Sequence, residues 1–127
     1  MPKTVLIVED EPSLQHALAD ALNRGETQVV TASNGQEGLT LALAKKPDIV
    51  VLDLLMPVMG GEEMLAQLRT DDWGKSVPVI ILSNVAEKDD IARNLNLVAD
   101  GNPLNDYLIK SNVSVDHLTQ LIAQKLA

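Results

Sequence analysis

Four short apolar segments of this chain each run into polar side chains that could hold a metal ion or a phosphoryl group. The polar residues are Glu9 and Asp10 after residues 5–8, Asp53 after 49–52, Ser83 after 79–82 and Lys110 after 107–109. Three carboxylates brought together repel one another unless a cation lies between them. Oxygen ligands without His or Cys favour Mg²⁺ or Mn²⁺ over zinc. An aspartate beside such a metal, a lysine and a hydroxyl is equipped to accept a phosphoryl group.

The apolar segments are the elements that must bring these residues together. Each is short, rich in Val, Ile and Leu and continuously apolar, which is typical of strands buried on both faces of a sheet. If the strands are parallel, their carboxyl ends share one edge, where open α/β sheets bind their ligands. The sequence therefore predicts one site at that edge.

Amphipathic helical segments alternate with the strands. A helix is predicted from Pro12 with Leu14, Ala17, Leu18, Ala21 and Leu22 inward, and a weak strand at residues 28–31. A second helix is predicted from Asn34–Gly35 to Pro47, with Leu39, Ala42 and Leu43 inward. A third is predicted at 61–70 with Met64, Leu65 and Leu68 inward, and a fourth at 87–97 with Ile91 and Leu95 inward. The last helix follows Ser114, and its buried face is predicted to contain Leu118, Leu121, Ile122, Lys125 and Leu126. Strand and helix alternate five times, which predicts a doubly wound α/β fold with a parallel five-stranded sheet. The carboxylates after the first and third strands predict that these two strands pair, which is the switch point of the order 2-1-3-4-5.

Composition limits the domain count and the classes of partner. A chain of 127 residues is enough for one domain, and we expect a single domain over 1–127. Ten basic against eighteen acidic residues give a net charge of −8, which argues against nucleic acid and anionic membranes as partners. No apolar stretch approaches the roughly 20 residues of a membrane span. With no signal-peptide pattern and no cysteine, the simplest expectation is a soluble cytoplasmic protein.

Four segments together resemble the receiver domain of bacterial response regulators, the chemotaxis-regulator-like domain of two-component signalling. They are Leu6-Ile7-Val8-Glu9-Asp10-Glu11-Pro12, Asp53-Leu54-Leu55-Met56-Pro57-Val58-Met59-Gly60-Gly61, Pro78-Val79-Ile80-Ile81-Leu82-Ser83 and Asn105-Asp106-Tyr107-Leu108-Ile109-Lys110. The resemblance covers nearly the whole chain and implies the flavodoxin-like (βα)5 fold.

The resemblance also implies a role for each site residue. Asp53 would be the phosphoacceptor, and Glu9, Asp10 and Asp53 would hold Mg²⁺ with the backbone carbonyl of Leu55. Ser83 and Lys110 would contact the phosphoryl oxygens, and Tyr107 would turn inward when Ser83 moves toward the phosphate. Such a domain is no classical enzyme, although it assists its own phosphorylation and dephosphorylation.

The partners that the resemblance implies are a sensor histidine kinase or phosphotransfer protein and a downstream protein. The downstream protein would bind the face formed by the fourth helix, fifth strand and fifth helix, and the domain would be a monomer or a phosphorylation-dependent dimer.

The sequence departs from the family pattern in ways that leave alternatives open. Asn84 follows Ser83 where a smaller residue is usual, and Ser111 follows Lys110 where proline is usual. One alternative is therefore a pseudo-receiver that binds partners without phosphorylation. Another is a metal-dependent phosphatase with an aspartate nucleophile, which the position of Asp53 on the third strand disfavours. A flavin protein of the same fold is disfavoured because the chain has no Phe, one Trp and one Tyr.

Overall fold

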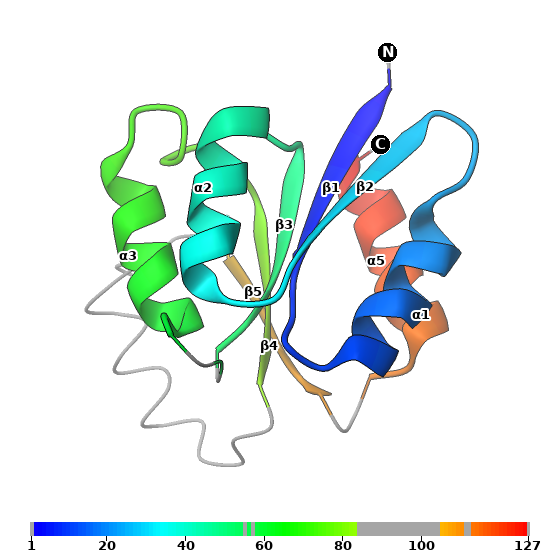
Figure 1. The fold of residues 1–127 in the computed structure, drawn as a ribbon. Coiled ribbons are helices and arrows are strands. Elements are labelled where there is room, and N and C mark those ends of the chain that lie inside the picture. The colour runs from blue at the N-terminus through cyan, green and yellow to red at the C-terminus, as the bar shows by residue number, and fades with distance from the viewer. Residues whose placement is uncertain (1, 55, 57, 84–104, 111–112, 127) are drawn as a thin grey trace.

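The computed structural model describes residues 2–54, 56, 58–83, 105–110 and 113–126. These residues form five strands and four helices around one sheet (Figure 1). In chain order the elements are β1 Lys3–Val8, α1 Pro12–Leu22, β2 Thr27–Ala32, α2 Gly35–Lys45, β3 Ile49–Asp53, α3 Gly61–Thr70, β4 Val79–Ser83, β5 Asn105–Ile109 and α5 Val115–Leu126.

The sheet has the predicted order, β2-β1-β3-β4-β5, and all its pairs are parallel. Val8 pairs with Leu52, so β1 and β3 end side by side. Asp53 pairs with Leu82, and Ser83 pairs with Ile109. The prediction of a doubly wound 2-1-3-4-5 sheet is confirmed, and the register brings the carboxyl ends of β1, β3, β4 and β5 to one edge.

The continuous apolar strands bury both faces because helices cover each side of the sheet (Figure 1). Side chains alternate along a strand, so Leu6 and Val8 face the layer of α2 and α3, whereas Val5 and Ile7 face that of α1 and α5. The same alternation divides the residues of β3 and β4 between two aliphatic cores. This explains how a chain with almost no aromatic residues fills its interior.

Helix α2 buries a face that differs by one position from the prediction. Asn34 begins the helix, where its Oδ1 accepts a hydrogen bond from the backbone N–H of Glu37 at 2.8 Å. Leu39 and Ala42 are buried as predicted, but the prediction for Leu43 is wrong, since that residue is 40% exposed. The packed stripe instead includes Gly35 and Gly38, whose lack of a side chain brings the helix close to its neighbours.

Helices α1, α3 and α5 follow the prediction more closely. Helix α3 spans the predicted 61–70 and buries Met64, Leu65 and Leu68. In α5, the hydroxyl of Ser114 accepts a hydrogen bond from the N–H of His117 at 3.0 Å, and Leu118 and Ile122 are buried. Two single positions were predicted wrongly: Ala17 in α1 and Lys125 in α5 are exposed, and Lys125 instead forms an ion pair with Asp106 of β5. Exposure of Lys125 follows from the cost of burying an ammonium group.

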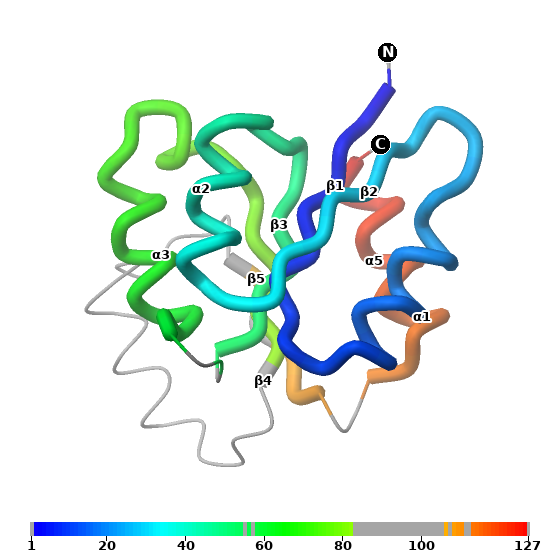
Figure 2. The backbone as a smooth tube through the Cα atoms, in the orientation of Figure 1, coloured from blue at the N-terminus to red at the C-terminus, as the bar shows by residue number. Residues whose placement is uncertain are grey.

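Each helix returns the chain from the carboxyl edge of the sheet to the opposite edge. Both chain termini consequently lie at that opposite edge, away from the loops after β1 and β3 (Figure 2). The predicted helix at 87–97 and the connection 98–104 lie outside the described residues, and so do Asn84 and Ser111.

Gly61 fixes the approach of α3 to the end of β3. Its N–H donates a hydrogen bond to Leu54 O at 3.0 Å, and a Cβ atom there would lie 2.3 Å from Asp53 O. We expect Gly61→Ala to lower the free energy of unfolding by about 1–3 kcal/mol, because backbone must shift to admit the methyl group. Urea denaturation followed by Trp73 fluorescence measures this, with Gln67→Ala on the exposed face of α3 as the control. Equal denaturation midpoints for the two variants would contradict the close packing.

Candidate functional site

Three carboxylates converge where β1 and β3 end. One carboxylate oxygen from each of Glu9, Asp10 and Asp53 lies within 4.8 Å of the others. Glu9 is 1% exposed and Asp53 4% exposed, whereas Asp10 is exposed to solvent. The convergence predicted from the strand ends is confirmed for these three residues.

Lys110 supplies the positive charge of the cluster. Its Nζ lies 2.8 Å from Glu9 Oε1, 3.4 Å from Asp53 Oδ2 and 3.6 Å from Glu11 Oε2. The short contact to Glu9 is a hydrogen bond from the ammonium to a buried carboxylate, which is stronger than one between neutral groups. Lys110 therefore reaches across the end of β4 to the two buried acids.

The surroundings of Lys110 keep it protonated. Burial alone would lower the pKa of this ammonium, but the hydrogen bond to Glu9 and the negative charges of Asp53 and Glu9 outweigh burial and raise the pKa above the ordinary 10.5. At neutral pH the cluster therefore holds one fixed cation against several carboxylates.

The raised pKa makes the contribution of Lys110 to stability depend on pH. The stabilisation is fully present below the unfolded-state pKa of about 10.5 and is lost as the pH rises through the higher pKa of the folded protein. In EDTA, the difference in unfolding free energy between wild type and Lys110→Met should therefore stay constant below about pH 10.5 and shrink as the pH rises above it. Denaturant titrations across this range measure the difference, and a constant value would contradict the ion pairing.

Glu9 has coordination capacity left for a metal ion. Its Oε1 accepts hydrogen bonds from Lys110 and from the N–H of Glu11, at 2.8 and 3.0 Å. Its Oε2 is buried and has no hydrogen-bond partner among the described residues. An unpaired buried carboxylate oxygen is costly, and a bound cation would satisfy it. The oxygen-only set of Glu9, Asp10 and Asp53 thus fits a hard divalent cation such as Mg²⁺.

The remaining predicted site residues are described only in part. Ser83 closes β4 beside Ile109, and Tyr107 pairs with Ile81 in the middle of the β4–β5 ladder. The side chains of Ser83 and Tyr107, and the whole of Leu55, lie outside the described part of the chain. The roles assigned to these three residues stay predictions.

Two contacts at the site were not anticipated from the sequence. Glu11 is a further acid near Lys110, and its position directly after the acid pair was a signal that could have pointed to it. Gln15, in the first turns of α1, donates hydrogen bonds from Nε2 to Glu9 O at 2.9 Å and to Ala32 O at 3.1 Å. No sequence pattern marks this residue, because a glutamine on a partly exposed helix face is ordinarily solvated.

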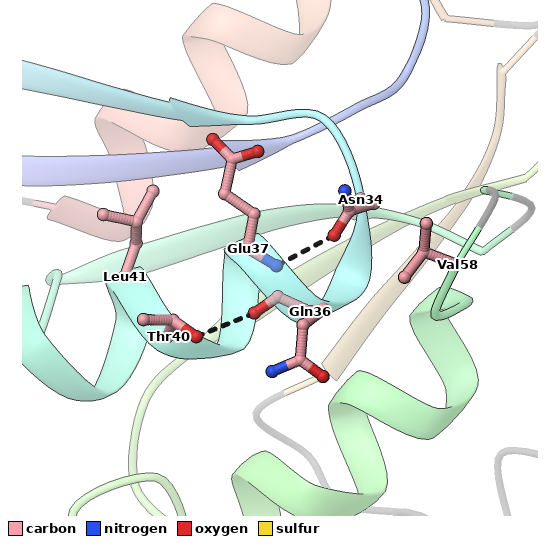
Figure 3. A pocket seen from close by; sticks show the side chains of 6 residues that line it. All are labelled: Asn34, Gln36, Glu37, Thr40, Leu41 and Val58. Carbon is pink, nitrogen blue, oxygen red and sulfur yellow. Dashed lines mark hydrogen bonds between the residues drawn. The ribbon is translucent and has the colours of Figure 1, made fainter.

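A shallow pocket of about 360 Å³ lies beside α2 and contains none of the site residues. Its lining comprises Asn34, Gln36, Glu37, Thr40, Leu41 and Val58 (Figure 3). The polar groups here already serve the helix, since Asn34 caps it and the Thr40 hydroxyl donates to Gln36 O at 3.0 Å. We therefore assign the chemistry to the carboxylate cluster and not to this pocket.

Comparison with known proteins shows the family to which the chain belongs. The family model of the response regulator receiver domain matches residues 5–123. The chain belongs to this family. Receivers are regulatory domains of two-component signalling and not classical enzymes.

The chain is similar to named proteins of different lengths. It is 37% identical over 110 residues to the alkaline phosphatase synthesis transcriptional regulatory protein PhoP of Bacillus subtilis, matching 87% of this chain and 43% of that protein. It is 34% identical over 118 residues to the hybrid signal transduction histidine kinase D of Dictyostelium discoideum, matching 93% of this chain and 7% of that protein. The chain thus spans less than half the length of these two relatives. It is also 36% identical over 86 residues to PilH of Pseudomonas aeruginosa, matching 68% of this chain and 71% of that protein.

Solved structures share the fold. The chemotaxis response regulator CheY4 of Vibrio cholerae superimposes with a TM-score of 0.83 at 24% identity, covering 98% of this chain and 99% of that one. The receiver domain of the Francisella response regulator 1452 gives a TM-score of 0.79 at 26% identity, covering 97% and 95%. Among the described residues, no helix has the length and apolar character needed to cross a membrane.

Proposed function

We propose that this receiver accepts one phosphoryl group on Asp53 in a Mg²⁺-dependent reaction. The observation that carries the proposal is the cluster of Glu9, Asp10 and Asp53 with the Lys110 ammonium 3.4 Å from the Asp53 carboxylate. The phosphoryl group would come from the phosphohistidine of a sensor histidine kinase or phosphotransfer protein. We expect the reaction to take place in the cytoplasm.

In the proposed reaction, a carboxylate oxygen of Asp53 forms a bond to phosphorus while the phosphorus–nitrogen bond of a phosphohistidine breaks. The electron pair of that bond returns to the imidazole. Negative charge spreads over the three equatorial oxygens in the transition state, and Lys110 is close enough to Asp53 to neutralise part of it. The Ser83 hydroxyl is proposed as a further donor to these oxygens.

Glu9, Asp10 and Asp53 would hold the metal ion, together with the carbonyl of Leu55. Bound Mg²⁺ would supply electrostatic stabilisation of the transferring group. The protein residues keep the acids in place before the reaction: Lys110 prevents the repulsion of Glu9 and Asp53 from opening the site.

We further propose that the new phosphoryl charge is transmitted through Ser83 and Tyr107 to β5 and α5, on the face where the resemblance also places the fourth helix. A charge added at one point can bias an element that has two arrangements. That face would bind a downstream protein or a second copy of the receiver.

Intact-mass measurement tests the proposal. After incubation with Mg²⁺ and acetyl phosphate, we expect wild type to gain the mass of one phosphoryl group. EDTA should prevent the gain, and the nearly isosteric Asp53→Asn should fold normally but stay unmodified. An unmodified wild type would instead favour a pseudo-receiver, and equal gain in Asp53→Asn would refute the assignment of the phosphoacceptor.

A further inference from the structure

The loop that carries Glu9 and Asp10 is tied to the start of α1 by one side chain. Gln15 donates hydrogen bonds from its amide nitrogen to Glu9 O at 2.9 Å and to Ala32 O at 3.1 Å. Glu9 N–H also donates to Ala32 O, at 3.0 Å. Gln15 thereby joins the ends of β1 and β2 to the first turns of the helix.

The bond to Glu9 O determines how the chain continues into Asp10. The carbonyl of Glu9 and the N–H of Asp10 belong to one planar peptide unit, so holding the carbonyl fixes the orientation of that unit. The Asp10 carboxylate is exposed and has no contact of its own that would fix it among those described. Its position beside Glu9 and Asp53 depends on the backbone from which it projects.

We propose that Gln15 is a positioning residue for the metal site, acting through the Glu9–Asp10 peptide. This inference rests on the proposed function, in which Glu9, Asp10 and Asp53 hold Mg²⁺. The described hydrogen bonds of the Gln15 side chain go to backbone carbonyls and not to the carboxylates of the metal site. It keeps the acid pair in the arrangement that the ion requires.

Gln15→Met tests the inference, because methionine keeps the length of the side chain and removes both donors. We expect the Mg²⁺ dissociation constant to rise about three- to tenfold. Removing a side chain that hydrogen-bonds to the coordinating group itself costs roughly 10–100-fold, and the effect should be smaller here because Gln15 binds the backbone of Glu9. Isothermal titration of the metal-free protein with MgCl₂ measures it. His16→Met, at the next and exposed position of α1, is the control and should bind Mg²⁺ like wild type.

Phosphorylation kinetics separate positioning from a general loss of structure. The Mg²⁺ concentration that gives half the maximal rate with acetyl phosphate should rise in Gln15→Met by the same factor as the dissociation constant. The rate at saturating Mg²⁺ should stay within about twofold of wild type, because excess metal restores the occupied site. A lowered rate at saturating Mg²⁺ with an unchanged half-maximal concentration would overturn the proposal.

The outcomes distinguish this inference from the proposed function. Wild type and Gln15→Met binding Mg²⁺ equally would overturn the role of Gln15 and leave the proposed function intact. Wild type that binds Mg²⁺ but gains no phosphoryl group would refute the function, while the binding comparison would still decide the role of Gln15. If Gln15→Met fails to fold, Gln15→Asn replaces it; its shorter side chain should weaken Mg²⁺ binding in the same way, and unchanged binding would overturn the proposal.

Discussion

Lys110→Met is expected to slow phosphorylation by acetyl phosphate by about a hundredfold or more, the usual cost of removing one preorganised charge from a transition state. The reason is the position of its Nζ, 3.4 Å from Asp53 Oδ2, where it can neutralise the phosphoryl oxygens. The rate is measured by intact mass against time at saturating Mg²⁺. A rate close to that of wild type would show that Lys110 has no part in the transfer.

The same substitution should destabilise the metal-free protein. Glu9 and Asp53 are almost fully buried, and removing the cation between them leaves two uncompensated buried charges. Breaking a buried ion pair from one side costs about 3–5 kcal/mol. Adding Mg²⁺ should restore part of this loss, because the ion takes over the neutralisation.

Lys75→Met is the matched control for Lys110→Met. Lys75 pairs with Asp72 at 3.6 Å, but both side chains are largely exposed. Such a surface pair contributes about 1 kcal/mol or less. If the two variants unfold at the same denaturant concentration in EDTA, Lys110 does not stabilise the acid cluster.

Asp10→Ala is expected to change Mg²⁺ binding and stability in opposite directions. Losing one of three carboxylate ligands should weaken Mg²⁺ binding at least about tenfold, equivalent to roughly 1.4 kcal/mol. In EDTA the variant should be more stable than wild type by up to about 1 kcal/mol, because repulsion from Glu9 and Asp53 is relieved. Thermal melts with EDTA and with Mg²⁺ measure both effects.

Asp72→Ala controls for the loss of one negative charge. Its carboxylate is fully exposed and does not belong to the acid cluster, so neither Mg²⁺ binding nor stability should change appreciably. An Asp10→Ala variant that is less stable than wild type in EDTA would mean that Asp10 does not repel its neighbours as the clustering implies.

The site could be predicted from the sequence as far as the backbone of the sheet determines it. In a parallel sheet the carboxyl ends of the strands share an edge, so Glu9, Asp10, Asp53 and Lys110 could be placed together from strand ends alone. The rule requires only that the four apolar segments be strands, which their short length and continuous Val, Ile and Leu content predict. Alternation of strands with helices predicted the parallel doubly wound sheet, and the carboxylates after the first and third strands indicated that these two strands pair, as they do in the order 2-1-3-4-5.

Contacts that depend on side-chain conformation could not be predicted in this way. The sequence predicts that Lys110 contacts phosphoryl oxygens, but it does not reveal that the ammonium pairs most closely with Glu9, the more deeply buried acid. Gln15 acts on backbone carbonyls that no periodicity reveals. The inward assignment of Leu43 failed because glycines, which carry no hydrophobic signal, form the close contact of α2.

Localising the modified residue tests the central claim most directly. Borohydride reduces an acyl phosphate to the alcohol, so a phosphorylated aspartate becomes homoserine and can be identified by peptide mass spectrometry. After treatment with Mg²⁺ and acetyl phosphate, we predict homoserine at position 53 and unmodified acids at Glu9 and Asp10. Modification at Glu9, at Asp10 or at any residue other than Asp53 would contradict the account.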